Sequence, residues 1–436
     1  MANKSIKIII LLLLLLIVIL IINHYFIPHK PNVVVIVIDA LRPDRLPFYG
    51  YKKATAPFMS RLASKGVVFQ NAYSVTSWTA PSVASIFTSL YPFQHGVTMG
   101  LLAQRKQYII DPTIHPNRIP ESITTLAEFM KEQGYQTYGV ADNDNISDIQ
   151  GFHQGFDQFI NHSRKTAKKV NEECRHLLSK TQSNKPYFLY IHYNDTHVPY
   201  DIPLPDITTD ANKFANMKAV YDKEISLVDE HIKALYDSLG WNKNTMIIIT
   251  ADHGEEFKEH GFFGHGGSLN HEVLKVPLLF YFPTAFAHNR KIYDNVMNID
   301  IYPTISDFIR REQPKDLSGI SLLPFVQRKI SVLNNRYLYA QLHKKRYQED
   351  DLLIKSVLYM NYHYIWQYPD DNKLFDKNKD PKEKINLYTT EKYIAHQLAA
   401  NLVNFEKTCK KYYKEAVTIQ LDQKKIEELK SLGYVQ

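Results

Sequence analysis

Residues 32–39 read Asn-Val-Val-Val-Ile-Val-Ile-Asp, and this stretch decides the predicted fold. A near-continuous run of β-branched residues is typical of a strand that is buried on both faces. Further short apolar runs alternate with helical patterns, which predicts an α/β fold: a mostly parallel sheet with helices on both sides. The predicted strands are Asn32–Asp39, Thr137–Ala141, Tyr187–Tyr193, Thr245–Thr250 and Pro277–Phe282, and the predicted helices are Pro57–Ser64, Pro81–Leu90, Ser122–Gln133, Thr166–Thr181 and Phe214–Leu239.

The pattern changes after Pro303, where three short strand-like runs precede a long helical stretch. Such a meander followed by a helix predicts a smaller C-terminal α+β subdomain. The predicted strands are Tyr337–Leu342, Ile354–Leu358 and Tyr362–Tyr368, and the helix is Ala395–Tyr413. The predicted organisation is a membrane anchor over 1–28, a catalytic domain over 29–325 and the C-terminal subdomain over 326–436.

The N-terminus carries an unbroken Ile/Leu/Val run from Ile8 to Ile22. With its apolar flanks the run reaches about 20 residues, enough for one transmembrane helix. Lys4 and Lys7 precede the run and favour a cytoplasmic N-terminus. The alternative is a cleaved signal peptide, but the bulky residues 23–28 offer no small-residue cleavage site. We therefore expect a single-pass protein of the cytoplasmic membrane with its catalytic domain on the outer face.

Composition excludes several classes. The 436 residues include 52 Lys and Arg against 45 Asp and Glu, a net charge of +7. This mild, unclustered surplus does not predict a nucleic-acid partner. The only cysteines, Cys174 and Cys409, exclude a disulfide scaffold and a cysteine-rich zinc module.

Polar residues gather where three predicted strands end. Asp39 ends the first run, Asp195 and His197 follow the third, and Asp252 and His253 follow the fourth. In a doubly wound sheet, ligands bind beyond the carboxyl ends of the strands. Carboxylates and imidazoles suit a divalent cation such as Mn, Mg, Ca or Zn. Any one of these residues alone is more often a helix cap or a loop residue, but three strand ends together favour a metal site.

The segment Thr79-Ala80-Pro81-Ser82 resembles a helix start, because proline is favoured in the first turn. A hydroxyl there faces unpaired backbone amides, a natural place for an oxyanion. The simpler alternative is that Thr79 only caps the helix.

Longer stretches resemble the sulfatase family of the alkaline-phosphatase superfamily. They include PNVVVIVIDALRPDRLPFYGY, SVTSWTAPSVASIFTSLYPFQHGV, YNDTHVPY and TADHGEEFKEHGFFGHGGSLNHEVLKVPLLFY, in the family's order over nearly the whole chain. The resemblance implies an alkaline-phosphatase-like fold and a metal-dependent hydrolase of an anionic ester. It also implies a role for each matching residue: Asp39, Thr79, Asp252 and His253 as metal ligands, Thr79 as nucleophile, and His197 and His265 as catalytic and substrate-binding residues.

The sequence departs from the family pattern at three places. Thr79 occupies the slot where sulfatases carry the Cys or Ser that becomes formylglycine, and Val83 replaces the supporting Arg. After GYQT the family's sulfate-binding Lys is missing, and Asn143 is the candidate neutral donor to the substrate. The usual Asp pair reads Asp39-Ala40. With these departures the sequence resembles the Thr-nucleophile branch of the superfamily. That branch contains phosphoester hydrolases and phosphoethanolamine or phosphoglycerol transferases.

Three functions remain open at this stage. The first is a hydrolase or transferase of phosphate esters or diesters that uses Thr79, with lipid-linked and glycan-linked esters as the candidate substrates. The second is a sulfuric ester hydrolase that works without formylglycine. The third is a catalytically silent, membrane-tethered binding protein. The complete set Asp39, Thr79, Asp252 and His253 argues against the third.

Overall fold

The computed structural model describes residues 30–101, 105–106, 109–110, 116–162, 166–182, 185–202, 210–241, 244–286, 288–309, 314–328, 335–344, 352–369, 371–410, 417–419 and 427. No helix within these ranges is long and apolar enough to cross a membrane. The run Ile8–Ile22, on which the predicted anchor rests, lies outside the described residues, so the anchor stays a prediction.

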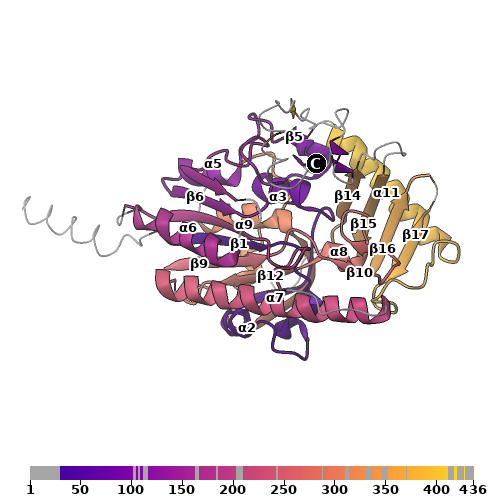
Figure 1. The fold of residues 1–436 in the computed structure, drawn as a ribbon. Coiled ribbons are helices and arrows are strands. Elements are labelled where there is room, and N and C mark those ends of the chain that lie inside the picture. Colours follow the sequence, from indigo (N-terminus) through magenta and orange to yellow (C-terminus); the bar gives the residue numbers. More distant parts are fainter. Residues whose placement is uncertain are drawn as a thin grey trace, which may run out of the picture.

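An eight-stranded sheet forms the centre of the molecule (Figure 1). All neighbouring strands pair in parallel except β12, which is antiparallel to both of its neighbours. The sheet is therefore mixed and mostly parallel, as predicted. In spatial order the strands are β13 (Arg290–Met297), β2 (Val67–Tyr73), β12 (Lys275–Tyr281), β9 (Thr245–Thr250), β1 (Asn32–Ile38), β8 (Tyr187–Tyr193), β6 (Gln136–Ala141) and β7 (Gln158–Asn161).

The β-branched run in β1 forms the middle of this sheet. Every residue from Val33 to Ile38 is buried, as expected for a strand with helices on both faces. β1 pairs in parallel with β8 on one side and with β9 on the other, so that Val37 lies beside both His192 and Thr250. The carboxyl ends of these three strands therefore meet at one edge of the sheet.

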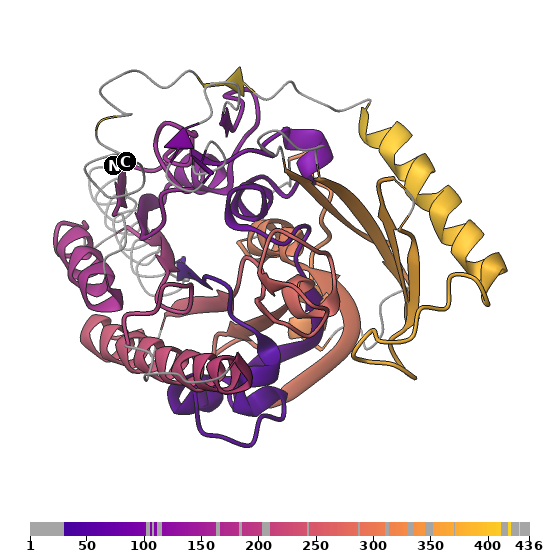
Figure 2. The same cartoon turned by 45° about the vertical axis from the view of Figure 1, so that its right-hand side comes forward.

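Helices cover both faces of the large sheet (Figure 2). On one face α2 (Pro57–Ala63) and α6 (Ala167–Ser179) pack against the long helix α7 (Asp210–Leu239). On the other face α3 (Thr79–Thr88) contacts α5 (Leu126–Glu132) and α9 (Ile301–Phe308). All ten residues of α3 are buried, so this helix runs through the core and fixes the position of its first residue.

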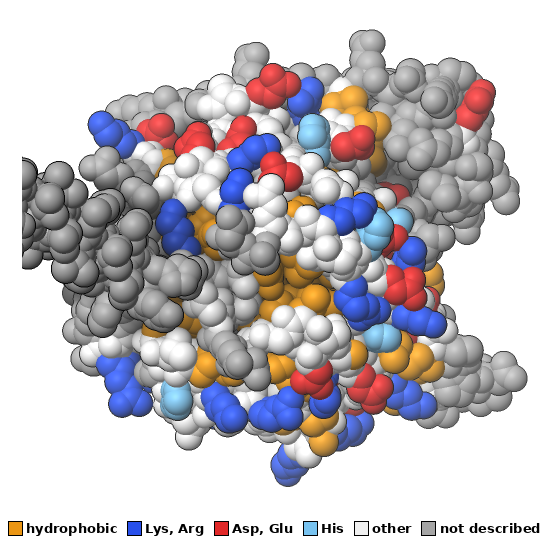
Figure 3. Space-filling model, turned by 90° about the vertical axis from the view of Figure 1, so that its left-hand side faces the viewer, with side chains coloured by type: hydrophobic (Ala, Val, Ile, Leu, Met, Phe, Trp, Pro, Cys, Tyr) orange, Lys and Arg blue, Asp and Glu red, His pale blue; other side chains and the backbone are white. Residues whose placement is uncertain are grey.

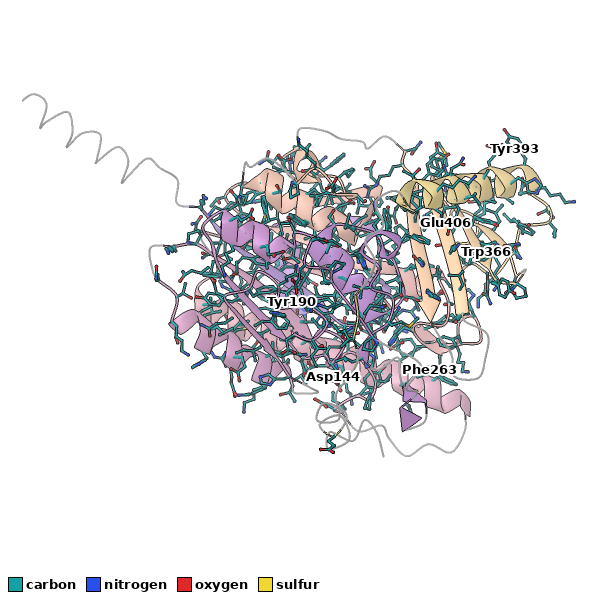
Figure 4. The ribbon with its side chains drawn as sticks, turned by 90° about the horizontal axis from the view of Figure 1, so that it is seen from above. Asp144, Tyr190, Phe263, Trp366, Tyr393 and Glu406 are labelled. Carbon is teal, nitrogen blue, oxygen red and sulfur yellow. The ribbon has the colours of Figure 1, made fainter. Side chains whose placement is uncertain are left out.

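A second, four-stranded antiparallel sheet follows in the order β14 (Leu338–Lys344), β15 (Leu352–Tyr359), β16 (Tyr362–Gln367) and β17 (Lys373–Asp376). Helix α11 (Lys392–Lys410) covers this sheet. Lys355 of β15 forms an ion pair with Glu406 of α11 and lies 4.9 Å from the centre of the Trp366 ring. Figure 4 labels Glu406 on the helix and Trp366 on the sheet that the helix covers. The predicted C-terminal meander and helix are thus present.

Charged side chains of both signs are interspersed over the described part of the face in Figure 3.

The remaining described elements are short. The short elements are 3₁₀ turns at Pro43–Arg45, Pro47–Tyr49 and Asn298–Asp300, the helices α4 (Pro92–His95), α8 (His271–Leu274) and α10 (Leu323–Val326), and the strands β3 (Arg105–Lys106), β4 (Ile109–Ile110), β5 (Asn117–Arg118), β10 (Glu256–Phe257), β11 (Phe263–Gly264) and β18 (Val417–Thr418).

Candidate active site

Four of the residues singled out from the sequence meet at the carboxyl edge of the large sheet. Asp39 follows β1, Asp252 and His253 follow β9, and Thr79 is the first residue of α3. All four are buried, with exposed fractions of 0% for Asp39, Asp252 and His253 and 3% for Thr79. Charged groups at this depth need a counter-charge or hydrogen bonds, which makes their mutual geometry informative.

Four side-chain atoms that could bind a cation lie close together at this edge. His253 Nε2 lies 3.5 Å from Asp39 Oδ1, 3.4 Å from Asp252 Oδ2 and 3.3 Å from Thr79 Oγ1. His253 Nδ1 lies 2.8 Å from the carbonyl oxygen of Gly254. Nδ1 therefore carries the proton and donates it, which leaves the lone pair of Nε2 directed at the two carboxylates.

The two carboxylates each leave one oxygen unpaired. Asp39 Oδ1 and Asp252 Oδ2 are buried and accept no hydrogen bond from any described residue. Two such oxygens beside an imidazole lone pair are costly unless a cation binds between them. Two carboxylate oxygens, one imidazole nitrogen and one hydroxyl fit the ligand preferences of a divalent cation. The residues present therefore fit a metal ion.

The second oxygen of Asp39 is held by Asn143, which the sequence singled out as a substrate contact, and by His192, which it did not single out. Asn143 Nδ2 donates to Asp39 Oδ2 at 2.7 Å, and His192 Nε2 lies 3.3 Å from the same oxygen. Tyr190 OH lies 3.0 Å from His192 Nδ1. Burial raises the pKa of Tyr190 well above its usual value, so the hydroxyl keeps its proton and donates it to His192.

His192 thus carries its own proton on Nε2 and donates it to Asp39. The ligand atoms of Asp39, His192 and Asp252 lie within 4.8 Å of one another. His192, however, contacts Oδ2, whereas the unpaired oxygen Oδ1 faces His253. We therefore assign His192 to positioning Asp39. Burial by itself raises the pKa of Asp39, but His197, the hydrogen bond from His192 and His253 together hold it well below its usual range.

Asp252 is fixed by the backbone. Its Oδ1 accepts hydrogen bonds from the backbone N–H of His253 at 2.9 Å and of Ala40 at 3.2 Å. Ala40 makes the second bond from a left-handed conformation with φ of 56°, which is unfavourable for a residue with a Cβ. The sequence therefore turns sharply after Asp39 so that the next amide reaches the second carboxylate.

Ser82, one turn into α3, connects the nucleophile candidate to the candidate metal ligands. Its hydroxyl donates to the carbonyl oxygen of Asp252 at 2.6 Å and accepts from Asn298 Nδ2 at 3.0 Å. These bonds hold the N-terminal turn of α3 against the end of β9. The Thr79 hydroxyl then lies beside His253 and 3.5 Å from Asp39 Oδ2.

The two other predicted catalytic histidines lie beside this cluster. The ring centre of His265 lies 4.3 Å from that of His253 and 4.8 Å from that of His197. His265 Nδ1 lies 3.1 Å from Oε1 of Glu255, a fully buried carboxylate. Burial lowers the pKa of His265, but Glu255, together with Asp39 and Asp252, outweighs burial and raises the pKa above its usual value. Burial lowers the pKa of His197, only partly offset by Asp39.

Three other polar residues near the cluster have different surroundings. Asn143 Nδ2 donates to Asp39 Oδ2 and, at 3.2 Å, to Asn194 Oδ1, so its contact with substrate stays a prediction. Arg42 is held by Asp44, Glu259 and a backbone carbonyl rather than facing the cluster. Asp195 Oδ1 accepts from the backbone N–H of Ala167 at the start of α6, the contact of a helix-capping residue.

Comparisons with known proteins identify the family of this chain. The sulfatase family model matches residues 31–309, and the model of the N-sulphoglucosamine sulphohydrolase C-terminal region matches residues 258–408. The chain belongs to the sulfatase family of the alkaline-phosphatase superfamily, a family of hydrolases.

Curated relatives are distant but cover most of the chain. A Delta 4,5-hexuronate-2-O-sulfatase of Bacteroides thetaiotaomicron is 23% identical and aligns with 84% of this chain and 86% of its own length. The multifunctional alkaline phosphatase superfamily protein PehA of Trinickia caryophylli is also 23% identical, over 84% of this chain and 93% of its own. An arylsulfatase of Clostridium perfringens is 22% identical over 84% of this chain and 91% of its own length.

Solved structures share the fold. A 2-O GAG sulfatase superposes with a TM-score of 0.74 at 20% identity, covering 90% of this chain and 95% of its own. The phosphonate monoester hydrolase of Agrobacterium radiobacter superposes with a TM-score of 0.69 at 17% identity, covering 87% and 96%. The same fold thus carries both sulfatases and a phosphonate ester hydrolase, so the fold alone does not choose between phosphorus and sulfur.

Proposed function

We propose that this protein is a metal-dependent hydrolase of phosphate esters or diesters that uses Thr79 as its nucleophile. The observation that carries the proposal is the position of Thr79 Oγ1, 3.3 Å from His253 Nε2 at the first turn of a buried helix. A nucleophile held by the residues that also bind the cation needs no separate general base. Membership of a hydrolase family supports hydrolysis over transfer to an acceptor.

Asp39, Thr79, Asp252 and His253 would hold the cation. When bound, a divalent cation lowers the pKa of a coordinated hydroxyl and offsets negative charge on the ester oxygens. Ser82 and the helix contacts hold Thr79 in place for attack. Thr79 Oγ1 gives its proton to solvent water and attacks phosphorus; the bond to the leaving oxygen breaks, and that oxygen takes a proton from His265. Water then attacks phosphorus and gives a proton to His265, and the bond between phosphorus and Thr79 Oγ1 breaks.

His265 is the proposed proton donor to the leaving oxygen. Glu255 accepts from Nδ1 at 3.1 Å, so the opposite nitrogen, Nε2, is the one available to the substrate. The carboxylate also favours the protonated imidazole, which is the form a general acid needs. His197, next to His265 and with a lowered pKa, suits contact with the ester as a neutral side chain.

The relatives favour a second candidate, hydrolysis of sulfate esters. Several of them are named sulfatases, including the hexuronate-2-O-sulfatase and the arylsulfatase, and these names support the sulfate ester better than a phosphoester transferase. This chain's own residues support phosphorus. Thr79 cannot become formylglycine, and Val83 stands where the supporting Arg would be. We give the local chemistry more weight because the relatives are only 22–23% identical.

The substrate and its location extend the proposal. The names of relatives, a hexuronate-2-O-sulfatase and a 2-O GAG sulfatase, favour an ester carried on a glycan. The apolar run Ile8–Ile22 would hold the enzyme on the outer face of the cytoplasmic membrane, close to glycan or lipid. The silent binding protein is disfavoured, because two unpaired buried carboxylate oxygens are a costly feature for a scaffold to keep.

A matched substrate panel tests the reaction. The 4-nitrophenyl phosphate monoester, the bis(4-nitrophenyl) phosphate diester and 4-nitrophenyl sulfate share one leaving group. We expect turnover of a phosphate ester that chelation abolishes and a divalent cation restores, with weak or absent turnover of the sulfate. A wide preference for the sulfate would establish the second candidate instead. No turnover of any ester with any added cation would favour the binding protein.

A further inference from the structure

A polar cavity lies between the large sheet and the C-terminal sheet, away from Thr79. Its volume is about 550 Å³, and its walls include Tyr73 at the end of β2, Lys275 at the start of β12 and Lys377 just after β17. The two sheets are joined here by direct contacts: Lys377 Nζ donates to Tyr73 OH at 2.9 Å, and Asn295 Nδ2 donates to the carbonyl oxygen of Met360 at 2.9 Å. Its described lining residues include none of the proposed catalytic residues.

The walls of this cavity are cationic. Lys275, Lys377 and Arg336 line it, against one carboxylate, Asp294. Arg336 is neutralised by an ion pair with Asp300. The lysines have neutral partners instead: Lys275 Nζ donates to Asn71 Oδ1 at 3.1 Å, and Lys377 lies 4.7 Å from the centre of the Tyr73 ring.

Two carboxylates outside the cavity lining act on these lysines, Asp44 on Lys275 and Glu383 on Lys377. Glu383 has partners of its own. Its Oε1 lies 2.6 Å from His363 Nδ1, and its Oε2 accepts from the backbone N–H of His271 at 3.0 Å. Glu383 is buried behind these contacts. It raises the pKa of Lys377, but burial outweighs it. The two lysine charges are therefore only partly compensated.

Burial of the two lysine side chains without carboxylate partners costs free energy. It lowers the pKa of Lys377 to about 8 and also lowers the pKa of Lys275. A partly desolvated ammonium group without a carboxylate partner loses hydration without gaining an ion pair. Two such groups in the wall of one cavity would regain that free energy if an anion bound between them.

We propose that this cavity is an anion-binding site, in which Lys275 and Lys377 together hold a tetrahedral oxyanion, a sulfate or phosphate group. A cavity of about 550 Å³ is larger than a single such ion and lies in the range of small-molecule sites. Its occupant is thus either the free ion with water or a sulfated or phosphorylated sugar. The proposal does not depend on which ester Thr79 cleaves.

Residue-resolved lysine labelling of the full-length protein tests the site. A short pulse of acetic anhydride at pH 8 acetylates amines in their neutral form, and peptide mass spectrometry reads each lysine. Without anion, Lys377 should react faster than exposed Lys65 because its pKa is lower. Inorganic sulfate or phosphate that fills nine-tenths of the sites should slow Lys275 and Lys377 about tenfold and leave Lys65 unchanged, with chloride at matched ionic strength as reference.

Two further arms identify the source and exclude the active site. Protection by a sulfated hexasaccharide but not by inorganic ions would assign the site to a sugar-borne group. If the anion still slows acetylation of Lys275 and Lys377 after chelation and buffer exchange, the site is distinct from the Thr79 cluster. If this protection disappears when the cation is removed, the proposal is overturned. Equal labelling with and without all three anions also overturns it.

Variants give an independent measurement. Lys275→Met with Lys377→Met should remove the sulfate-dependent rise in melting temperature that persists after chelation, while Lys65→Met, which removes an exposed charge, should keep it. Turnover of a small nitrophenyl ester should be unchanged in both proteins. If sulfate raises the melting temperature of the lysine double variant as much as that of the parent, the proposed site is wrong.

Discussion

His265 Nδ1 lies 3.1 Å from Oε1 of Glu255. Glu255 has an exposed fraction of 0%, and its other oxygen accepts no hydrogen bond from the described residues. The carboxylate therefore acts on His265 with little competition from solvent, which orients the ring and favours its protonated form.

The first prediction concerns this pair. Glu255→Gln keeps the size of the side chain but removes its charge. We expect kcat to fall about tenfold to a hundredfold while KM and metal content change little, because the variant weakens the proton donor and not the cation site. Glu272→Gln is the matched control, since Glu272 pairs with His260 at 2.9 Å away from the cluster. Equal losses in the two variants would contradict the role of Glu255.

The second prediction concerns the proposed metal ligands. Asp252→Asn keeps Oδ1, which accepts the two backbone hydrogen bonds, but replaces the unpaired oxygen Oδ2. We expect the variant to lose bound metal and activity together. We also expect it to unfold at a higher temperature than the parent after chelation, because one of two close buried negative charges is gone. Elemental analysis and thermal denaturation measure these effects. Unchanged metal content would show that Asp252 is not a ligand.

The third prediction concerns the turn at Ala40. Its φ of 56° costs an alanine about 1 kcal/mol or more, and glycine adopts this conformation freely. Ala40→Gly should therefore raise the free energy of unfolding, by up to about 1 kcal/mol. Ala400→Gly, an exposed position within α11, should lower it by about 1 kcal/mol. Denaturant unfolding compares the two, and a loss of stability in both would contradict strain at Ala40.

The fourth prediction concerns acid stability. His95 is fully buried; its Nδ1 accepts from the backbone N–H of Val97 at 3.0 Å, and its Nε2 donates to Ser85 at 2.9 Å. Burial lowers its pKa from 6.5 to about 3. Because the folded pKa lies below the unfolded pKa, the contribution of His95 is complete above pH 6.5 and is lost as pH falls towards 3.

His95→Gln removes this titration. The variant should be less stable than the parent at pH 7, because glutamine does not reproduce both hydrogen bonds. The difference should shrink by up to about 1.4 kcal/mol for each pH unit below 6. Urea unfolding at pH 7, 6 and 5 measures it. A difference that stays constant over this range would show that His95 does not titrate in this way.

Much of the fold was predictable because its central strands carry their own signal. β1, β8 and β9 are mostly apolar, and their observed bounds lie within one residue of the predicted ones. β13 was missed: it reads RKIYDNVM, lies at the edge of the sheet and contains an irregularity between Ile292 and Asn295. An edge strand keeps one side in solvent and needs no continuous apolar run.

The convergence of Asp39, Asp252 and His253 also followed from the sequence, because parallel strands end at one edge. Two residues that support the cluster did not. His192 lies inside the buried strand β8, and a polar residue within such a run was the available signal. Glu255 stands in the quoted DHGEEF stretch, but which of its two glutamates reaches His265 depends on how β10 and β11 pair. Such contacts are set by tertiary packing.

The central claim is that Thr79 forms a covalent bond with the substrate's phosphoryl group. Intact-mass and peptide mass spectrometry after rapid mixing with a phosphate ester measure this directly, best in a His265→Ala background, where loss of the proton carrier should slow release of the group. We predict a phosphoryl-sized adduct on Thr79 that Thr79→Ala abolishes together with turnover. Near-parent turnover by Thr79→Ala, or turnover without an adduct on the Thr79 peptide at any mixing time, would contradict the account.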